Sequence, residues 1–369
     1  MDAPPSSLPG PRRWRHPRAL LSVATLVVLG LFAGFLATVD LVCLRGLWAA
    51  GSGQASPVGA PVSRTHAVAF HVAFGAAVVS YVSASLREPG AVPQGWGDGD
   101  EEGNTLLLRL AEEGKVAALV GGGGEGGLSS SSPSSSVATA GAGAGTGASA
   151  GEAGVAAEGR REGAPVEVKR STGGARRCKH CRHAKPPRAH HCRACRACVL
   201  RMDHHCLWLD TCVGHHNHKA FFCFLGWTSV ALCDATYILG RTLGMATLVR
   251  RSETRPGSLD VVMYLHAGQM SSVVTALVLG VGLAVGVGFL CLWHTHLLGA
   301  NRTTIEMHEG VRVTRRDGTR KTKADYENPY DLGGWLANAK EVLGPNPLTW
   351  MIPTASHGDG IHGGRRRST

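Results

Sequence analysis

Residues 178–224 read CKHCRHAKPPRAHHCRACRACVLRMDHHCLWLDTCVGHHNHKAFFCF, and this stretch decides what kind of fold the chain can form. Its first part, Cys178 to Cys212, holds seven of the chain's eleven cysteines, with three overlapping Cys-x2-Cys pairs. A structural zinc ion takes four sulfur or nitrogen ligands. Two such sites need eight, so six cysteines and two histidines would leave one thiol over. Because apolar residues are few here, we expect metal rather than a hydrophobic core to hold the segment together.

The spacing alone does not fix which side chains bind the metal. Several histidines compete as ligands, and for each of them a packed or surface imidazole is the alternative interpretation: His180, His183, His190, His215, His216 and His218. A thiol that the scaffold does not need is free to do chemistry, because the thiolate is a strong nucleophile.

Four long apolar stretches, nearly free of charge, surround the cysteine segment at residues 19–44, 66–87, 220–241 and 271–298. A helix needs about 20 apolar residues to cross a bilayer, and each stretch meets that length. Any one of them could instead be a buried core helix, and the first a signal peptide, although it is longer than a signal peptide's apolar region. The sequence therefore predicts a mainly α, polytopic membrane protein with four transmembrane helices and a small cytosolic zinc-stabilised domain at residues 174–219.

Basic residues set the expected orientation. The net charge is +11, and most of the excess lies in residues 1–18, between the second and third stretches, and after the fourth. This distribution places both termini and the cysteine segment in the cytosol, where clustered thiols are metal-bound or catalytic rather than disulfide-bonded. The charge is an ordinary positive-inside bias or a contact surface for anionic headgroups or a phosphorylated ligand. Membrane helices on both sides of the zinc unit argue against nucleic acid as a partner.

The remaining segments carry weaker signals. The cytosolic insert at residues 91–173 includes 104–120, which could form a short amphipathic helix or only a transient one. Residues 121–159 are rich in Gly, Ala and Ser and predict a disordered linker. We expect no internal repeat of functional scale. Residues 299–369 form the cytosolic C-terminal region, which ends in a solvated basic tail.

The motif order in residues 178–224 resembles the cysteine-rich domain of the DHHC protein S-acyltransferases, or palmitoyltransferases. CxxC, Lys/Arg-Pro-x-Arg, HCxxCxxC, DHHC-x-W and C-V-G-x-x-N follow one another as in that family. Three features elsewhere match too. Residues 88–90 (Glu-Pro-Gly) resemble an Asp-Pro-Gly motif, residues 303–306 (Thr-Thr-Ile-Glu) match TTxE, and residues 328–333 resemble the C-terminal conserved stretch.

The resemblance implies two structural zinc ions and a catalytic group of three residues. Cys206 would stay unligated as the nucleophile, with His204 as its general base and Asp203 orienting that imidazole. Thr304 of TTxE would approach Asp203. The first zinc would be held by Cys178, Cys181, His191 and Cys198, and the second by Cys192, Cys195, His205 and Cys212.

The implied reaction moves a long-chain acyl group, palmitoyl foremost, from acyl-CoA through acyl-Cys206 to cysteine thiols of membrane-associated proteins. Candidate walls for the acyl chain, which could instead face lipid or pack helices, are Trp208, Phe221 and Phe224. Lys185 and Arg188 are candidates for the CoA phosphates, or plain solvated charges. Golgi or endoplasmic reticulum is the expected membrane, and plasma membrane also suits the sequence.

One departure from the family pattern bears on the rate, and one alternative function stays open. Leu207 replaces the proline that most family members have after the nucleophile, which removes a backbone restraint beside Cys206. A membrane-anchored zinc adaptor that binds partners without catalysis would also explain the zinc ligands. Such an adaptor has no use for an unligated thiol beside His204, so it would tolerate Cys206→Ser.

Overall fold

The computed structural model describes residues 22–44, 64–92, 96, 166–167, 176–252, 267–311, 313–314, 328–358 and 360. The segments predicted as an amphipathic helix (104–120), a disordered linker (121–159) and a basic tail (365–367) lie outside these residues.

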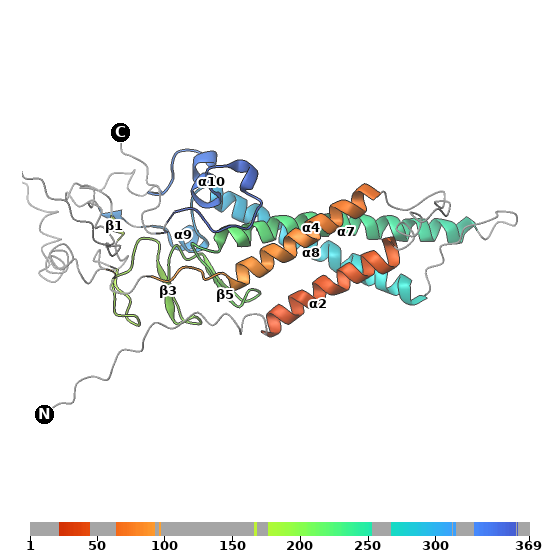
Figure 1. Ribbon diagram of the computed structural model, residues 1–369, viewed down its shortest axis with the longest axis horizontal. Coiled ribbons are helices and arrows are strands. Elements are labelled where there is room, and N and C mark those ends of the chain that lie inside the picture. Colours follow the sequence, from red (N-terminus) through yellow and green to blue (C-terminus); the bar gives the residue numbers. More distant parts are fainter. Residues whose placement is uncertain are drawn as a thin grey trace, which may run out of the picture.

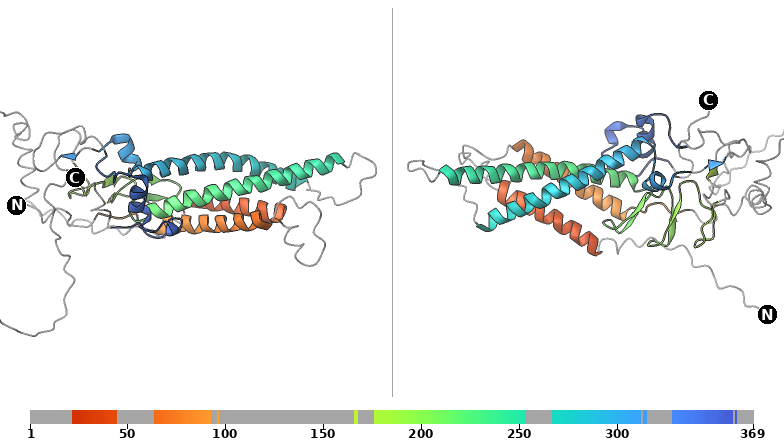
Figure 2. Two further views of the ribbon diagram at one scale, coloured as in Figure 1. Left: turned by 90° about the horizontal axis from the view of Figure 1, so that it is seen from above. Right: turned by 180° about the vertical axis from the view of Figure 1, so that it is seen from behind.

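Long helices make up most of the described chain. They are α2 (Val23–Ala37), which continues as the π-helix η1 (Thr38–Leu44), α4 (Arg64–Leu86), α7 (His218–Ser252) and α8 (Ala267–Gly299). Figures 1 and 2 show them side by side in an elongated bundle. Stretches of 19, 23, 27 and 31 residues within these helices are long and apolar enough to cross a membrane, which confirms the prediction of four transmembrane helices.

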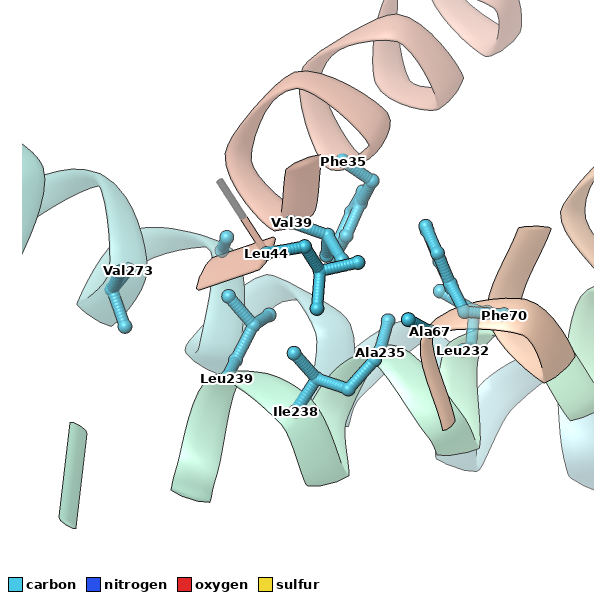
Figure 3. Packing of buried hydrophobic residues seen from close by; sticks show 11 residues of the cluster. Phe35, Val39, Leu44, Ala67, Phe70, Leu232, Ala235, Ile238, Leu239 and Val273 are labelled. Carbon is cyan, nitrogen blue, oxygen red and sulfur yellow. The ribbon is translucent and has the colours of Figure 1, made fainter. Parts of the chain in front are cut away.

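The bundle is packed inside and apolar outside. In the half away from the hairpins, side chains of α2, η1, α4, α7 and α8 form one buried cluster (Figure 3). Alanines such as Ala67 and Ala235 let the helices approach closely. On α8, Phe289 and Leu292 are each 71% exposed. Such an apolar surface would be costly in water, but it suits the hydrocarbon core of a bilayer.

The cysteine-rich domain sits at one end of the bundle (Figure 1) and is built from short antiparallel hairpins. Strand β2 (His190–Cys192) pairs with β3 (Ala197–Val199), and β4 (His204–Cys206) pairs with β5 (Thr211–Val213). A further short pair joins β1 (Val166–Glu167) to β6 (Val313–Thr314). The same end of the bundle carries α9 (Thr304–Glu309), α10 (Trp335–Leu343) and the 3-10 turn η4 (Pro347–Thr349).

The domain repeats one short unit at intervals of 14 residues, which the sequence analysis did not identify. Each unit is a pair of bridged residues around a tight turn, and the pairs are Arg177 with Ala184, His191 with Cys198, and His205 with Cys212. The turns begin at Cys178, Cys192 and Cys206, and the fifth residue of each has left-handed φ: Arg182, Arg196 and Asp210, at 61°, 55° and 51°. The backbone conformation repeats more closely than the residue types do, which is why the sequence pattern did not reveal this unit.

A buried ion pair attaches this domain to the segment that follows α8. Arg188 Nε and Nη2 donate to the two carboxylate oxygens of Glu306, each at 2.7 Å, and Nη1 donates to Asn301 Oδ1 at 3.0 Å. Asn301 Oδ1 also accepts from Arg201 Nη2 at 2.9 Å. Thr303 and Glu306 form a capping box at the start of α9, so the carboxylate that binds Arg188 also begins the helix.

Contacts from α4 and from Asn217, the residue before α7, hold the β4–β5 hairpin from the other side. Tyr81 donates its hydroxyl to Trp208 O at 2.9 Å. Asn217 Nδ2 donates to Ala84 O at 3.1 Å and to Cys212 O at 2.9 Å. The chain passes so closely here that a Cβ on Gly214 would lie 2.6 Å from a backbone oxygen. The position of Cys206 is therefore fixed by elements far apart in the sequence.

Candidate active site

Two Cys/His clusters occupy the cysteine-rich domain, and each can hold a metal ion. The ligand atoms of Cys178, Cys181, His191 and Cys198 lie within 4.8 Å of one another, and so do those of Cys192, Cys195, His205 and Cys212. In the second cluster the Nδ1 atom of His205 lies 3.5–3.7 Å from the three sulfurs. Three thiolates and one imidazole at such separations suit tetrahedral zinc. These are the two sets that the family resemblance implied.

The repeat explains how the clusters interlock. The turn of one unit supplies a Cys-x2-Cys pair, and the bridged His and Cys of the next unit supply the other two ligands. In the first two turns, the backbone N–H of the second cysteine donates to the sulfur of the first at 3.3 Å. The third turn begins with Cys206 but has Leu209 where the second cysteine would stand. Among the described residues no fourth unit follows, so Cys206 belongs to neither cluster.

Beside Cys206, the side chains of Asp203 and His204 are aligned by hydrogen bonds. His204 Nδ1 lies 2.7 Å from Asp203 Oδ2, and we assign the proton to Nδ1 because an ionised carboxylate only accepts. Thr304 at the start of α9 donates its N–H to Asp203 Oδ1 and its hydroxyl to Oδ2, both at 2.8 Å. The Asp203 side chain is fully buried. The carboxylate is therefore held from two directions, and its orientation fixes that of His204.

Burial and hydrogen bonding compete in setting the protonation states. Burial favours neutral Asp203, but the hydrogen bond from His204 outweighs it and holds the carboxyl pKa well below its usual range. Burial likewise opposes protonated His204, yet its hydrogen bonds with Asp203 and Cys206 raise its pKa to about 9. Burial also disfavours ionised Cys206. His204 and the backbone N–H groups of Leu209 and Trp208 nonetheless lower the thiol pKa below its ordinary value.

An apolar cluster surrounds the sulfur on the membrane side. Cys206 is 7% exposed and packs in one cluster with Tyr81 of α4, and with Phe221 and Leu225 of α7. Side chains of α2 and α8 border the same cluster, so all four candidate spans reach it. The Phe221 ring lies 5.4 Å from the His204 ring. The thiol thus lies where the polar hairpin meets the apolar interior of the bundle.

The other residues expected to contact the acyl donor fall into different surroundings. Phe224 is half-buried and its ring lies 5.4 Å from that of Tyr81, whereas Trp208 is 59% exposed. Lys185 is partly exposed. Arg188 is 6% exposed and engaged with Glu306 and Asn301, which favours a structural role. Contact of Lys185 and Arg188 with CoA phosphates stays a prediction.

Three residues that line or border the site were not singled out from the sequence. Tyr81 lies in an apolar stretch, and nothing in the pattern marks it. Asn217 ends the C-V-G-x-x-N motif, which was used only for the resemblance. His294 of α8 lies with its ring 6.1 Å from that of His204. A buried histidine within a candidate span is costly and was itself a signal of function.

A polytopic membrane protein with a metal-binding cysteine domain, and with a thiol–imidazole pair set against its spans, is the class that this fold and site define. Residues 171–311 match the family model of DHHC palmitoyltransferases. Over 197 residues the chain is 43% identical to Probable protein S-acyltransferase 16 of Arabidopsis thaliana, covering 53% of this chain and 64% of that protein. Over 188 residues it is 35% identical to Probable protein S-acyltransferase 15 of the same plant, covering 50% and 68%.

A vertebrate protein shows the same likeness. Palmitoyltransferase ZDHHC15A of Danio rerio is 33% identical over 197 residues, covering 53% of each chain. The matched segment thus spans about half to two thirds of the length of these relatives. On the family model and these identities, the chain belongs to the DHHC palmitoyltransferase family.

Proposed function

We propose that the protein is a protein S-acyltransferase that moves a long-chain acyl group from acyl-CoA to cysteine thiols of membrane-associated proteins. One observation carries the proposal. Cys206 is spared from both metal clusters and lies beside an imidazole whose orientation Asp203 fixes. A scaffold or adaptor needs the eight metal ligands, but it needs neither this thiol nor this imidazole.

In the first step, the Cys206 sulfur attacks the thioester carbonyl carbon of acyl-CoA. The raised pKa of His204 and the lowered pKa of Cys206 favour a thiolate–imidazolium pair at rest, so no proton need be removed before attack. The bond from the carbonyl carbon to the CoA sulfur breaks, and His204 gives its proton to that sulfur. CoA leaves as a thiol, and Cys206 carries the acyl chain.

In the second step, a cysteine thiol of the protein substrate takes the place of CoA. His204, now neutral, accepts the proton of that thiol, and the resulting sulfur attacks the acyl carbonyl. The bond to Cys206 breaks and the thiolate–imidazolium pair is restored. Both steps exchange one thioester for another, so the protein's main contribution is placement of the reactants.

The metal clusters serve this placement. The eight ligands already named would hold two zinc ions, and zinc with four protein ligands supplies rigidity rather than chemistry. The β4–β5 hairpin carries two ligands of the second cluster, His205 and Cys212, so the neighbour of Cys206 is tied to the metal. The small hairpin thereby keeps one orientation at the end of the bundle.

The surroundings suggest where the rest of the substrate lies. We propose that the acyl chain extends from Cys206 along the apolar cluster between the spans, past Phe221 and Phe224, while the CoA phosphates stay in water near Lys185. The positive-inside bias supports a cytosolic active site. Golgi or endoplasmic reticulum remains the proposed location, with the plasma membrane as the alternative.

Acylation of the purified protein tests the function. The full chain in lipid nanodiscs is incubated with labelled palmitoyl-CoA and then with a lipid-anchored peptide bearing one cysteine. We expect a hydroxylamine-sensitive label on the protein that passes to the peptide. Cys206→Ser removes the label while two zinc ions per chain remain.

The matched control is Cys233→Ser, which changes an exposed cysteine of α7 and keeps the label. An adaptor would show no label in either protein and would tolerate Cys206→Ser. A label that persists in Cys206→Ser, or a zinc ion lost from it, would remove the assignment of Cys206 as the nucleophile.

A further inference from the structure

A third group of metal-ligand side chains lies next to the catalytic residues, outside both cysteine clusters. It consists of Asp203, at the entry to β4, His218, the first residue of α7, and His294, in the last third of α8. One ligand atom from each lies within 4.8 Å of the others, and their exposures are 0%, 1% and 3%. The start of β4, the start of α7 and the last third of the distant helix α8 thus bring one carboxylate and two imidazoles together in the interior.

Each of the two histidines has a ring nitrogen that is available to a ligand. The Nδ1 atoms of His218 and His294 are buried and lack a hydrogen-bond partner among the described residues. A buried polar atom without a partner costs free energy, and a ligand that engages it recovers that cost. No thiol belongs to this group, so its chemistry differs from that of the two cysteine clusters.

The geometry suits a divalent cation. Zinc lies about 2.0–2.1 Å from histidine nitrogen and carboxylate oxygen, which puts tetrahedral ligand atoms about 3.3 Å apart. The three ligand atoms need to approach one another by at most about 1.5 Å, which side-chain rotation can supply. Two imidazoles and one carboxylate form a ligand set that zinc uses with a fourth position left for water.

The charges around this group limit its affinity for a cation. Asp203 supplies the one negative charge of the group, while Arg201 is close enough to act electrostatically on His218 and opposes a cation. The cysteine clusters offer three thiols each. We therefore expect an ion here to bind far more weakly than the two structural ions and to be removable without unfolding the domain.

The geometry points to Asp203, His218 and His294 as an inhibitory site for a divalent transition-metal ion such as Zn²⁺. Asp203 already accepts hydrogen bonds from His204 and from Thr304. A cation that binds the carboxylate competes with His204 for it and places positive charge beside the imidazolium. His204 then loses the partner that orients it toward Cys206. The inhibition rests on the proposed function, whereas the binding of the ion does not.

Metal counting tests the site without any assay of activity. The full-length protein in nanodiscs, with both structural zinc ions present, is equilibrated with buffered free Zn²⁺, and zinc per chain is measured by mass spectrometry. We expect three ions in the natural protein and two in the double variant His218→Gln/His294→Gln. His308→Gln, which changes an exposed histidine of α9, is the matched control and keeps three.

Two further measurements sharpen the result. A mild chelator should remove the third ion and leave two. Co²⁺ bound in the third site should give visible absorption bands. It should not give the near-ultraviolet bands that Co²⁺ shows when thiolates bind it, because this group has no thiol. Two ions in the natural protein, or three in the double variant, would overturn the site.

The inhibition is read separately from the rate at which Cys206 acquires the acyl label. The rate should fall at least tenfold as free Zn²⁺ fills the third site and recover with the mild chelator. In His294→Gln, the same zinc should leave that variant's own rate unchanged. A third ion that binds without slowing acylation would overturn the inhibition and keep the site. If the natural protein shows no acylation under any condition, the proposed function and the inhibition fall together, while the metal count still decides the site.

Discussion

At the scale of single residues, Asp203 is the side chain on which the geometry of the candidate active site depends most. Its two carboxylate oxygens accept hydrogen bonds from His204 and from the backbone and hydroxyl of Thr304. An amide in the same place has only one accepting oxygen, and its NH2 group would face a donor. The substitution keeps the volume but removes the charge that stabilises the imidazolium.

We therefore expect Asp203→Asn to slow the acylation of Cys206 by about 100-fold or more, a typical contribution of a positioned acid–base group. The rate is measured in a single turnover with labelled palmitoyl-CoA, and zinc content is measured in parallel. Asp210→Asn is the control. Asp210 is exposed in the turn of the same hairpin and has φ of 51°, a conformation that asparagine tolerates. Equal rates for the two variants would show that the carboxylate of Asp203 does not act through His204.

Residue-level prediction from the sequence was most specific where the residues are neighbours in the chain. Counting ligands left one thiol, and the adjacency of Asp203, His204 and Cys206 pointed to a triad. Prediction from the sequence was weaker where the interacting residues lie far apart in the chain. Arg188 was expected at the CoA phosphates, but its partner Glu306 lies 118 residues away and no local pattern links them.

At the scale of elements, the decisive unit is the 14-residue hairpin repeat. In two repeats the turn cysteines belong to a cluster that can hold a metal ion, and the third has only Cys206, because Leu209 occupies the place of the second cysteine. Cys206, the proposed nucleophile, therefore stands at the position of a turn cysteine but belongs to neither Cys/His cluster. The long helices were predictable because apolar length alone defines them. The hairpins were not, since metal and distant contacts set their register rather than alternating hydrophobicity.

Helix α9 and the ion pair at its start hold the hairpins in place, so the pair should contribute to stability as well as to activity. Glu306→Gln removes the carboxylate that pairs with the buried Arg188 guanidinium. Loss of one partner of a buried pair costs about 3–5 kcal/mol. We expect a clear fall in the midpoint of thermal unfolding in detergent, followed by tryptophan fluorescence, and slower acylation because Thr304 moves with α9. Glu309→Gln, at the exposed end of the same helix, should change the free energy of unfolding by no more than about 0.5 kcal/mol and leave the midpoint nearly unchanged. A midpoint equally unchanged in Glu306→Gln would show that the pair does not anchor the domain.

At the scale of the whole molecule, the membrane-spanning bundle and the cysteine-rich domain are held together by different forces. The spans are held by apolar packing, as the buried cluster of Figure 3 shows, and their outward faces suit lipid. The cysteine-rich domain has small satellite clusters built in part from its own candidate metal ligands. Composition predicted this division, because the apolar residues gather in four stretches and the cysteines in one. It did not predict that Cys206 would pack into the apolar cluster of the spans.

Because the two parts depend on different forces, removal of metal should separate them. A strong chelator should strip two zinc ions and unfold the hairpins, since folding of such domains is linked to metal binding. The helical circular dichroism of the spans should stay nearly unchanged, while limited proteolysis should begin to cleave within residues 176–217. Acylation of Cys206 should stop with the loss of zinc and return when zinc is restored. If the helical signal collapsed together with the zinc, or if acylation continued without metal, the metal would not be what orients the thiol against the membrane-spanning bundle.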